Sequence, residues 1–235
     1  MHAMGERVDM ATDRSSDASH TIGIVGGTGS LGRGLASRLA LAGLHVTVGS
    51  RDSVRASQCA DELGAGVSAA SNEGACAQDL VIIAVPWSAH NATLAELARA
   101  LEGRTVIDAV NPIASDERGP YALAVEAGSA TQEAQRLLPS SVVVGAFHHL
   151  SAERLQSMDA LDADVLVVGD DREAIARVIA MIGVVPGLRG VYAGRLRNAG
   201  QIEALTANLI AINRRYRTQA GLRVTGLGSL EPSGS

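Results

Sequence analysis

The chain has 235 residues, a formal net charge of −5 at pH 7 and 46% hydrophobic residues, which suits one large α/β domain or a core domain with a smaller lobe. It contains no basic block, membrane-spanning apolar run or signal-peptide pattern, so we expect no nucleic-acid partner, no membrane anchor and a cytoplasmic location. One Trp, three Tyr and one Phe are its only aromatic residues, which predicts an aliphatic interior typical of a parallel sheet buried on both faces.

Residues 1–20 are polar and lack hydrophobic periodicity, which predicts a disordered leader. An apolar strand then begins at Thr21 and runs into a glycine-rich turn and a helix. Gly27, Gly29 and Gly32 satisfy the G-x-G-x-x-G pattern, in which the first glycine forms a tight turn, the second lets a pyrophosphate approach the backbone, and the third allows close helix packing. The pyrophosphate would lie on the free N–H groups at the start of the helix.

The second strand ends in Ser50 and Arg51, and Arg55 follows one helical turn later. At this point an NAD site places Asp or Glu, which accepts hydrogen bonds from the ribose 2′-hydroxyl. A hydroxyl and two guanidinium groups instead suit a dianionic 2′-phosphate. We therefore predict an NADP site.

Strands and helices continue to alternate along the rest of the chain. Ser53 is the expected N-cap of a helix ending near residue 63, and Asn72 is expected to cap a short helical turn. We expect further strands near 67–70, 79–85, 105–110, 142–147, 163–169 and 190–192, and further helices over 89–101, 131–138, 152–158, 172–182 and 198–217, whereas 113–126 is irregular.

This alternation predicts a doubly wound, mainly parallel sheet of the Rossmann type with a smaller C-terminal α/β lobe. We assign residues 21–147 to the NADP-binding domain, 148–228 to a lobe that completes the substrate site, and 229–235 to a flexible tail. Every basic residue is arginine, which excludes lysine-based catalysis. Cys59 and Cys76 form no CxxC or Cys/His cluster, so no metal site is predicted.

Ligands of open α/β sheets bind beyond the carboxyl ends of the strands. Pro86 and Pro112 follow two of these strands and would form a stiff, aprotic wall against a nicotinamide. His148 follows a third strand, after a Gly-Ala pair that leaves room for a flat ring. We predict that His148 hydrogen-bonds a carbonyl of a redox ring and stabilises charge during hydride transfer, whereas His149 packs or caps a helix.

Seven motifs together resemble the NADPH-dependent reductases of coenzyme F420, a 5-deazaflavin, from Ile22 to about Gly226. They are Gly26-Gly27-Thr28-Gly29-Ser30-Leu31-Gly32, Val48-Gly49-Ser50-Arg51, Val85-Pro86-Trp87, Ala146-Phe147-His148, Gly169-Asp170-Asp171, Glu203-Ala204-Leu205-Thr206 and Ile212-Asn213-Arg214-Arg215-Tyr216. The combination is far more specific than a dinucleotide fingerprint alone.

The resemblance implies a role for each of these segments. Thr28, Ser50, Arg51 and Arg55 would hold the 2′-phosphate, and the rest of the glycine turn would hold the dinucleotide. The residues implied to border the nicotinamide are Val85, Pro86, Trp87, Asn111 and Pro112, and those implied to border the deazaflavin are Ala146, Phe147 and His148. Family members are commonly dimers, and the apolar stripe of the last helix, at Ile202, Leu205, Leu209 and Ile212, would serve either core packing or a homodimer face.

The deazaflavin also carries a phosphate and a glutamate tail, which needs cations at the mouth of the cleft. Arg189, Arg195 and Arg197 are the candidates, although solvated surface arginines are the simpler interpretation of at least two of them.

The leading hypothesis is therefore an oxidoreductase that passes a hydride between NADP(H) and coenzyme F420. Such a transfer between two stacked rings needs orientation more than nucleophiles or metals. Two alternatives stay open: an NADP-dependent imine or ketone reductase, and a non-catalytic NADP-sensing regulatory protein. Only the two enzymes would be slowed by His148→Ala.

Overall fold

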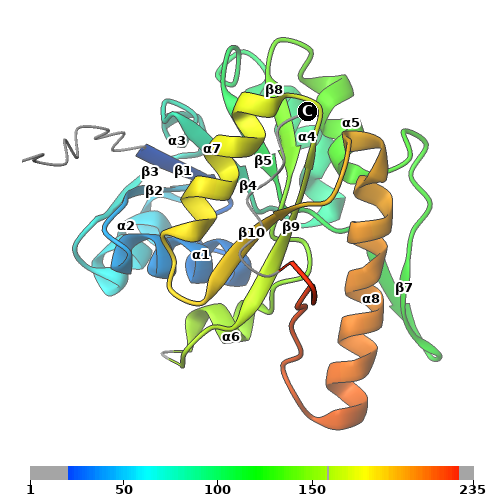
Figure 1. Cartoon of the computed structure of the whole chain (residues 1–235). Coiled ribbons are helices and arrows are strands. Elements are labelled where there is room, and N and C mark those ends of the chain that lie inside the picture. The colour runs from blue at the N-terminus through cyan, green and yellow to red at the C-terminus, as the bar shows by residue number, and fades with distance from the viewer. Residues whose placement is uncertain (1–20, 158, 228–235) are drawn as a thin grey trace, which may run out of the picture.

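The computed structural model describes residues 21–157 and 159–227, and the predicted leader and tail lie outside these residues. The chain forms an eight-stranded sheet flanked by helices and a separate two-stranded hairpin (Figure 1). The elements in chain order are β1 (Thr21–Val25), α1 (Ser30–Leu41), β2 (His45–Ser50), α2 (Ser53–Leu63), β3 (Val67–Ser71), α3 (Asn72–Ala75), β4 (Leu80–Ile83), α4 (Trp87–Leu97), β5 (Thr105–Asp108), β6 (Ile113–Asp116), β7 (Gly119–Ala122), α5 (Ala130–Leu137), β8 (Val142–Gly145), α6 (Ala152–Gln156), β9 (Ala163–Gly169), α7 (Arg172–Gly183), β10 (Leu188–Tyr192), the short 3-10 helix η1 (Leu196–Asn198) and α8 (Ala199–Tyr216).

The strand order in the large sheet is β10-β9-β8-β5-β4-β1-β2-β3. Every neighbouring pair is parallel except β8 and β9, which are antiparallel. The expected mainly parallel, doubly wound sheet is therefore confirmed. Strands β9 and β10 extend this same sheet, so the C-terminal part of the chain adds to the sheet that begins at β1.

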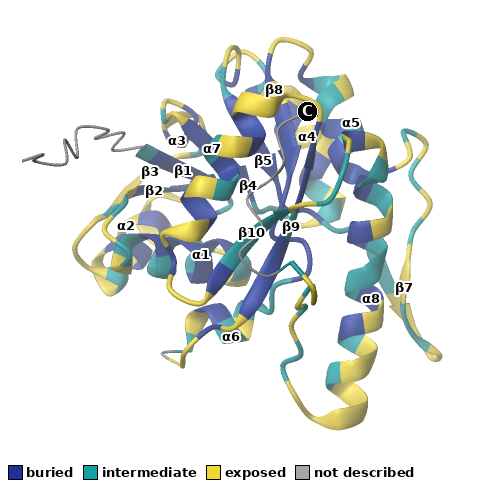
Figure 2. Cartoon of the chain, in the orientation of Figure 1, coloured by how far each residue is buried: buried dark blue, intermediate teal, exposed yellow. Residues whose placement is uncertain are grey.

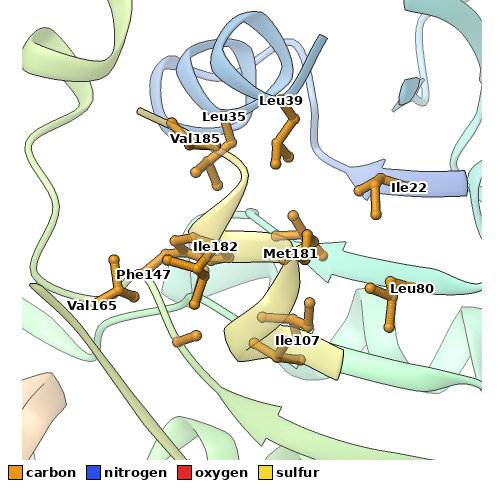
Figure 3. Close-up of a cluster of buried hydrophobic side chains, with 14 of the residues drawn as sticks. Ile22, Leu35, Leu39, Leu80, Ile107, Phe147, Val165, Met181, Ile182 and Val185 are labelled. Atoms are coloured by element: carbon orange, nitrogen blue, oxygen red, sulfur yellow. The ribbon is translucent and has the colours of Figure 1, made fainter. Parts of the chain in front are cut away.

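Apolar side chains fill both faces of the sheet. On one face, Leu35 of α1 and Met181 of α7 pack over Ile22 and Ile107 of the strands (Figure 3). A second cluster, which includes Leu94 of α4, covers the opposite face. The inner strands β1, β4, β5, β8 and β9 are largely buried, whereas the edge strand β3 and the β6–β7 hairpin are partly exposed. The helices alternate between buried and exposed positions (Figure 2), as expected for amphipathic helices on an aliphatic sheet.

Several sequence-based element boundaries were wrong. The stretch expected to be irregular contains the antiparallel hairpin of β6 and β7. Asp52, rather than Ser53, caps α2 by accepting a hydrogen bond from the Arg55 N–H, and Ser71, rather than Asn72, caps α3 through Gly74. Ser, Asp and Asn all cap helices well, so adjacent polar residues leave the position of a cap ambiguous by one residue.

Helix α8 runs beside the β6–β7 hairpin and past the end of the sheet (Figure 1). The segment after α8 returns to β9, where the buried carboxylate of Asp164 accepts hydrogen bonds from the Arg189 guanidinium at 2.8 and 2.7 Å and from the Val224 N–H at 2.6 Å. None of the helices in the described parts of the chain is long and apolar enough to cross a membrane.

Candidate active site

The glycine turn between β1 and α1 has little room for side chains except at one position. A Cβ atom on Gly32 would lie 2.7 Å from Gly27 Cα, and one on Gly27 would lie 2.9 Å from the Ile24 carbonyl oxygen. A Cβ on Gly29 would meet nothing closer than the Gly26 carbonyl oxygen at 3.3 Å, and Gly29 is exposed. The three glycines thus differ as the dinucleotide pattern requires, with the second one open to a ligand.

Gly29 is the N-cap residue of α1, and no side chain caps the helix. The first N–H groups of a helix have no partner within the helix and carry a partial positive charge. The turn therefore presents anion-binding donors at its exposed side. Asn72 supports it from α3, because its Oδ1 accepts a hydrogen bond from the Gly26 N–H at 3.3 Å. Sequence reasoning missed this role of Asn72, which no local motif signals.

A cleft of about 380 Å³ opens above this turn. Seven residues predicted from the sequence line it, namely Thr28, Gly29, Ser50, Arg51, Arg55, Val85 and Pro86. Six further residues lie in its wall, namely Gly26, Asp52, Asn72, Ala84, Ala89 and Thr93. The cleft therefore joins the glycine turn to the Ser-Arg pair at the end of β2.

Both arginines of this cleft are exposed, and neither forms an ion pair within the described residues. Asp52 is the one carboxylate in the wall, and its Oδ1 accepts the Arg55 N–H at 3.1 Å as the cap of α2. The Ser50 hydroxyl accepts the Asp52 N–H at 3.1 Å, which fixes its position at the strand end. Two free guanidinium groups and a hydroxyl suit a phosphate monoester.

A second cavity, of about 400 Å³, surrounds the segment after β8. Leu31, Asn111 and His148 were predicted from the sequence and lie in its wall, together with His149 and side chains of α8 such as Thr206 and Asn213. The predicted residues Gly27, Ser30, Gly32, Trp87, Pro112, Ala146 and Phe147 line neither this cavity nor the 380 Å³ cleft.

The backbone at His148 is tightly held. Its carbonyl oxygen accepts hydrogen bonds from Asn111 Nδ2 at 2.7 Å and from the Thr206 hydroxyl at 2.9 Å. The preceding residue, Phe147, has a φ of +68° although its side chain is buried in the core. A bulky residue in this region is strained, at a cost of about 1–3 kcal/mol, and such strain clusters at functional sites. Phe147 therefore turns the chain out of β8 and presents His148 to the cavity wall.

The side chain of His148 is connected to α8 through α5. Its Nε2 lies 3.5 Å from the Thr131 hydroxyl oxygen, and this hydroxyl lies 2.8 Å from a carboxylate oxygen of Glu203. Glu203 is buried and also accepts the N–H groups of Ala130 at 2.8 Å and Thr131 at 3.0 Å, so it fixes the first turn of α5. The two ends of the Glu203-Ala204-Leu205-Thr206 motif thus secure the His148 segment from both sides.

Buried polar atoms without a partner gather at the second cavity. Among the described residues these atoms are Asn111 Oδ1, His148 Nδ1 and His149 Nδ1, and all three residues line this cavity. Buried polar groups are rarely left without a hydrogen bond unless water or a ligand supplies it. The cavity wall therefore fits a ligand with several polar ring atoms.

Burial keeps both of these histidines neutral. It lowers the pKa of His148 below its usual 6.5, although the charges of Glu203 and Asp108 oppose the change. Burial, together with the neighbouring His148, lowers the pKa of His149 to about 4. His149 Nε2 also accepts the Leu166 N–H at 3.2 Å, which leaves its proton on Nδ1. At neutral pH both rings are uncharged, so they can orient a ligand but cannot act as cations.

A third histidine, His90 on α4, was not noticed in the sequence. Its Nε2 lies 2.6 Å from an Asp108 carboxylate oxygen at the end of β5, and both side chains are fully buried. Burial alone would lower the pKa of His90, but the hydrogen bond and the charge of Asp108 outweigh it and raise the pKa above 6.5. This buried pair joins α4 to the end of β5.

Two of the three arginines proposed from the sequence for an anionic tail are engaged elsewhere. Arg189 forms a bidentate ion pair with Asp164, and a guanidinium nitrogen of Arg195 lies 3.8 Å from a carboxylate oxygen of Asp170. Arg197 is exposed and lines neither cavity. No group of three or more His, Cys, Asp or Glu side chains in residues 21–157 and 159–227 could hold a metal ion.

Comparison with known proteins identifies the family. Residues 21–112 match the family model described as NADP oxidoreductase, coenzyme F420-dependent. The F420-dependent NADP reductase of Methanothermobacter thermautotrophicus is 36% identical over 89% of this chain and 97% of its own length. The chain belongs to the family of F420-dependent NADP reductases. The reductase of the same name from Methanocaldococcus jannaschii is 32% identical over 88% of this chain and 98% of its own.

A solved structure agrees with this assignment to the F420-dependent NADP reductases. It is that of a candidate F420-dependent NADP reductase from Arthrobacter sp. FB24, which has 25% sequence identity and a TM-score of 0.77. The match covers 88% of this chain and 99% of that one. The resemblance inferred from the seven sequence motifs is therefore confirmed at the level of the family.

Proposed function

We propose that this chain is an oxidoreductase that transfers a hydride between NADP(H) and coenzyme F420. The observation that carries the proposal is that the glycine turn lines one cavity and the first turn of α1, which follows it directly, lines the other. Thr28 and Gly29 line the cleft that ends at the Ser-Arg pair, and Leu31 lines the cavity around His148. Two ligands bound in these spaces would approach each other over the start of α1.

In this proposal the nucleotide lies in the 380 Å³ cleft. The open backbone at Gly29 and the N–H groups that begin α1 hold its pyrophosphate. Ser50, Arg51, Arg55 and Thr28 hold the 2′-phosphate. Because both guanidinium groups are free of protein carboxylates, binding the phosphate breaks no ion pair within the described residues.

The deazaflavin ring lies in the cavity at His148 and accepts or gives the hydride. Asn111, His148 and His149 have buried polar atoms without protein partners there, which supports recognition of ring carbonyl and N–H groups. His148 is neutral and held through its backbone carbonyl, so its role is to orient the ring and not to supply a charge. Hydride transfer needs the two reacting carbons about 3–3.5 Å apart, and rigid walls provide that orientation.

A spectroscopic assay tests the proposal. When the protein is mixed with NADPH and oxidised F420, the visible absorbance of the deazaflavin should bleach, and NADH should support much slower bleaching. If the absorbance bleaches with neither NADPH nor NADH, the proposal is contradicted. Parallel reactions with NADPH and small imines or ketones distinguish the reductase alternative, and tight NADPH binding without any turnover distinguishes a regulatory protein.

We also infer that the protein is a cytoplasmic homodimer. Helix α8 and the hairpin beside it carry exposed large side chains at Tyr121, Ile212 and Tyr216, and aromatic side chains are enriched in protein–protein interfaces. Sedimentation or light scattering should give twice the mass of the 24.1 kDa chain. A monomer at micromolar concentration would contradict the inference.

A further inference from the structure

A groove at the protein surface adjoins the cavity at His148. This groove has a volume of about 580 Å³ and lies between the start of α6 and the end of α8. It shares Glu153, Ile210, Asn213 and Gln219 with the wall of the cavity. The two spaces are therefore adjacent, and a chain that leaves the cavity past these shared side chains would lie in the groove.

Three arginines line the groove. Arg214 lies in the last turn of α8, Arg217 follows that helix, and Arg154 lies on α6. Arg214 and Arg217 are exposed and have no ion-pair or hydrogen-bond partner for their side chains among the described residues. Arg154 donates one hydrogen bond, to the Ala160 carbonyl oxygen at 2.9 Å.

The opposing charges in the groove are two carboxylates, those of Glu153 and Asp159. Glu153 already accepts a hydrogen bond from Gln219 Nε2. Three guanidinium groups against two carboxylates leave an excess of positive charge, whereas the whole chain carries a net charge of −5. This excess lies beside the cavity that the proposed function assigns to the second substrate.

Arg217 adds a conformational argument. It is the C-cap of α8 and adopts φ 52° and ψ 50°, a left-handed conformation that Gly or Asn adopts at lower cost. An arginine here is disfavoured by its backbone. Helix termination alone does not explain an arginine at this position, whereas a role for the positive charge of its side chain does.

We propose that Arg214 and Arg217, with Arg154, form a subsite for the anionic extension of the second substrate, a chain of phosphate and carboxylate groups. This inference rests on the proposed function and deepens it, because the deazaflavin carries such a tail. Positive side chains near a helix C-terminus also interact favourably with the helix dipole. The test must therefore separate a binding role of these arginines from a stabilising one.

The test compares two electron acceptors, the complete coenzyme F420 and the same deazaflavin ring without its phosphate and glutamate tail. The variant is Arg214→Gln/Arg217→Asn, which removes both charges while Gln retains helix propensity and Asn tolerates the left-handed conformation. The matched control is Arg172→Gln, which removes an exposed arginine that lines neither the cavity nor the groove.

The ratio of kcat/KM for the tailed acceptor to that for the tailless one should fall roughly tenfold in the double variant, since single exposed ion pairs contribute roughly two- to fivefold each. The control should retain the wild-type ratio. In the wild type, the ratio should also fall as the salt concentration rises. An unchanged ratio in the double variant, or equal losses with both acceptors, would overturn the subsite. If the wild type reduces neither acceptor with NADPH, the proposed function itself fails. If the wild type reduces both acceptors, the proposed function holds and the double variant tests the subsite alone.

Discussion

The buried carboxylate of Glu203 should be one of the most sensitive positions for stability. It accepts hydrogen bonds from two backbone N–H groups, of Ala130 and Thr131, and from the Thr131 hydroxyl, and its residue is 2% exposed. In Glu203→Ala the hydroxyl can turn to another acceptor, but the two amides remain buried without a partner. At about 1–3 kcal/mol for each of these two unsatisfied groups, the free energy of unfolding should decrease by about 2–6 kcal/mol.

Urea denaturation followed by circular dichroism measures this loss. With an m-value of about 2–3 kcal/mol/M, the midpoint of Glu203→Ala should decrease by about 1–3 M. Glu203→Gln keeps one acceptor oxygen and should lose less. The matched control is Glu96→Ala on α4, where the side chain is exposed and the change should stay within about 0.5 kcal/mol. If the Glu203 and Glu96 variants unfold at the same urea concentration, the assigned hydrogen bonds do not support α5.

Three further predictions concern pH, the turn and the nucleotide. The pKa of His149 is about 4 in the folded protein and 6.5 in the unfolded chain, so its contribution to stability is present above pH 6.5 and is lost as the pH falls toward 4. Between pH 7 and pH 5, the free energy of unfolding measured in urea titrations should therefore decrease by about 2 kcal/mol more in the wild type than in His149→Gln. Gly32→Ala should lower the Tm by several degrees, since its Cβ would lie 2.7 Å from Gly27 Cα. Gly29→Ala should fold normally but bind NADPH weakly in calorimetry. Equal Tm values for the two variants would contradict the packing argument. Arg51→Ala should raise the KM for NADPH about tenfold and leave the KM for NADH unchanged, and an equal rise for both nucleotides would contradict a 2′-phosphate contact.

Local patterns predicted the parts of the molecule that local residues determine. The spacing of Gly27, Gly29 and Gly32 after an apolar strand indicated the turn, and the Ser-Arg pair at the end of β2 does line the same cleft. The hairpin of β6 and β7 was missed because its strands contain Gly, Pro, Ser and Asp, which are weak strand formers. The antiparallel pairing of β8 and β9 in the large sheet is likewise not specified by any local sequence pattern.

Contacts between distant residues could not be predicted in this way. Glu203 and Thr131 are 72 residues apart, and His148 reaches Thr206 across 58 residues. These partners meet only because the sheet order brings α5, α8 and the end of β8 together. For the same reason, Arg189 suggested an anion site in the sequence but is bound to Asp164 in the structure, whereas Arg214 and Arg217 reach the groove.

The central claim is direct hydride transfer from one ring to the other. The decisive measurement uses NADPH that carries deuterium at the transferred position of the nicotinamide, with mass spectrometry of the reduced deazaflavin after a single turnover. The account predicts that the reduced F420 acquires one deuterium even in ordinary water. Reduced F420 without the label, with deuterium released to the solvent, would contradict it.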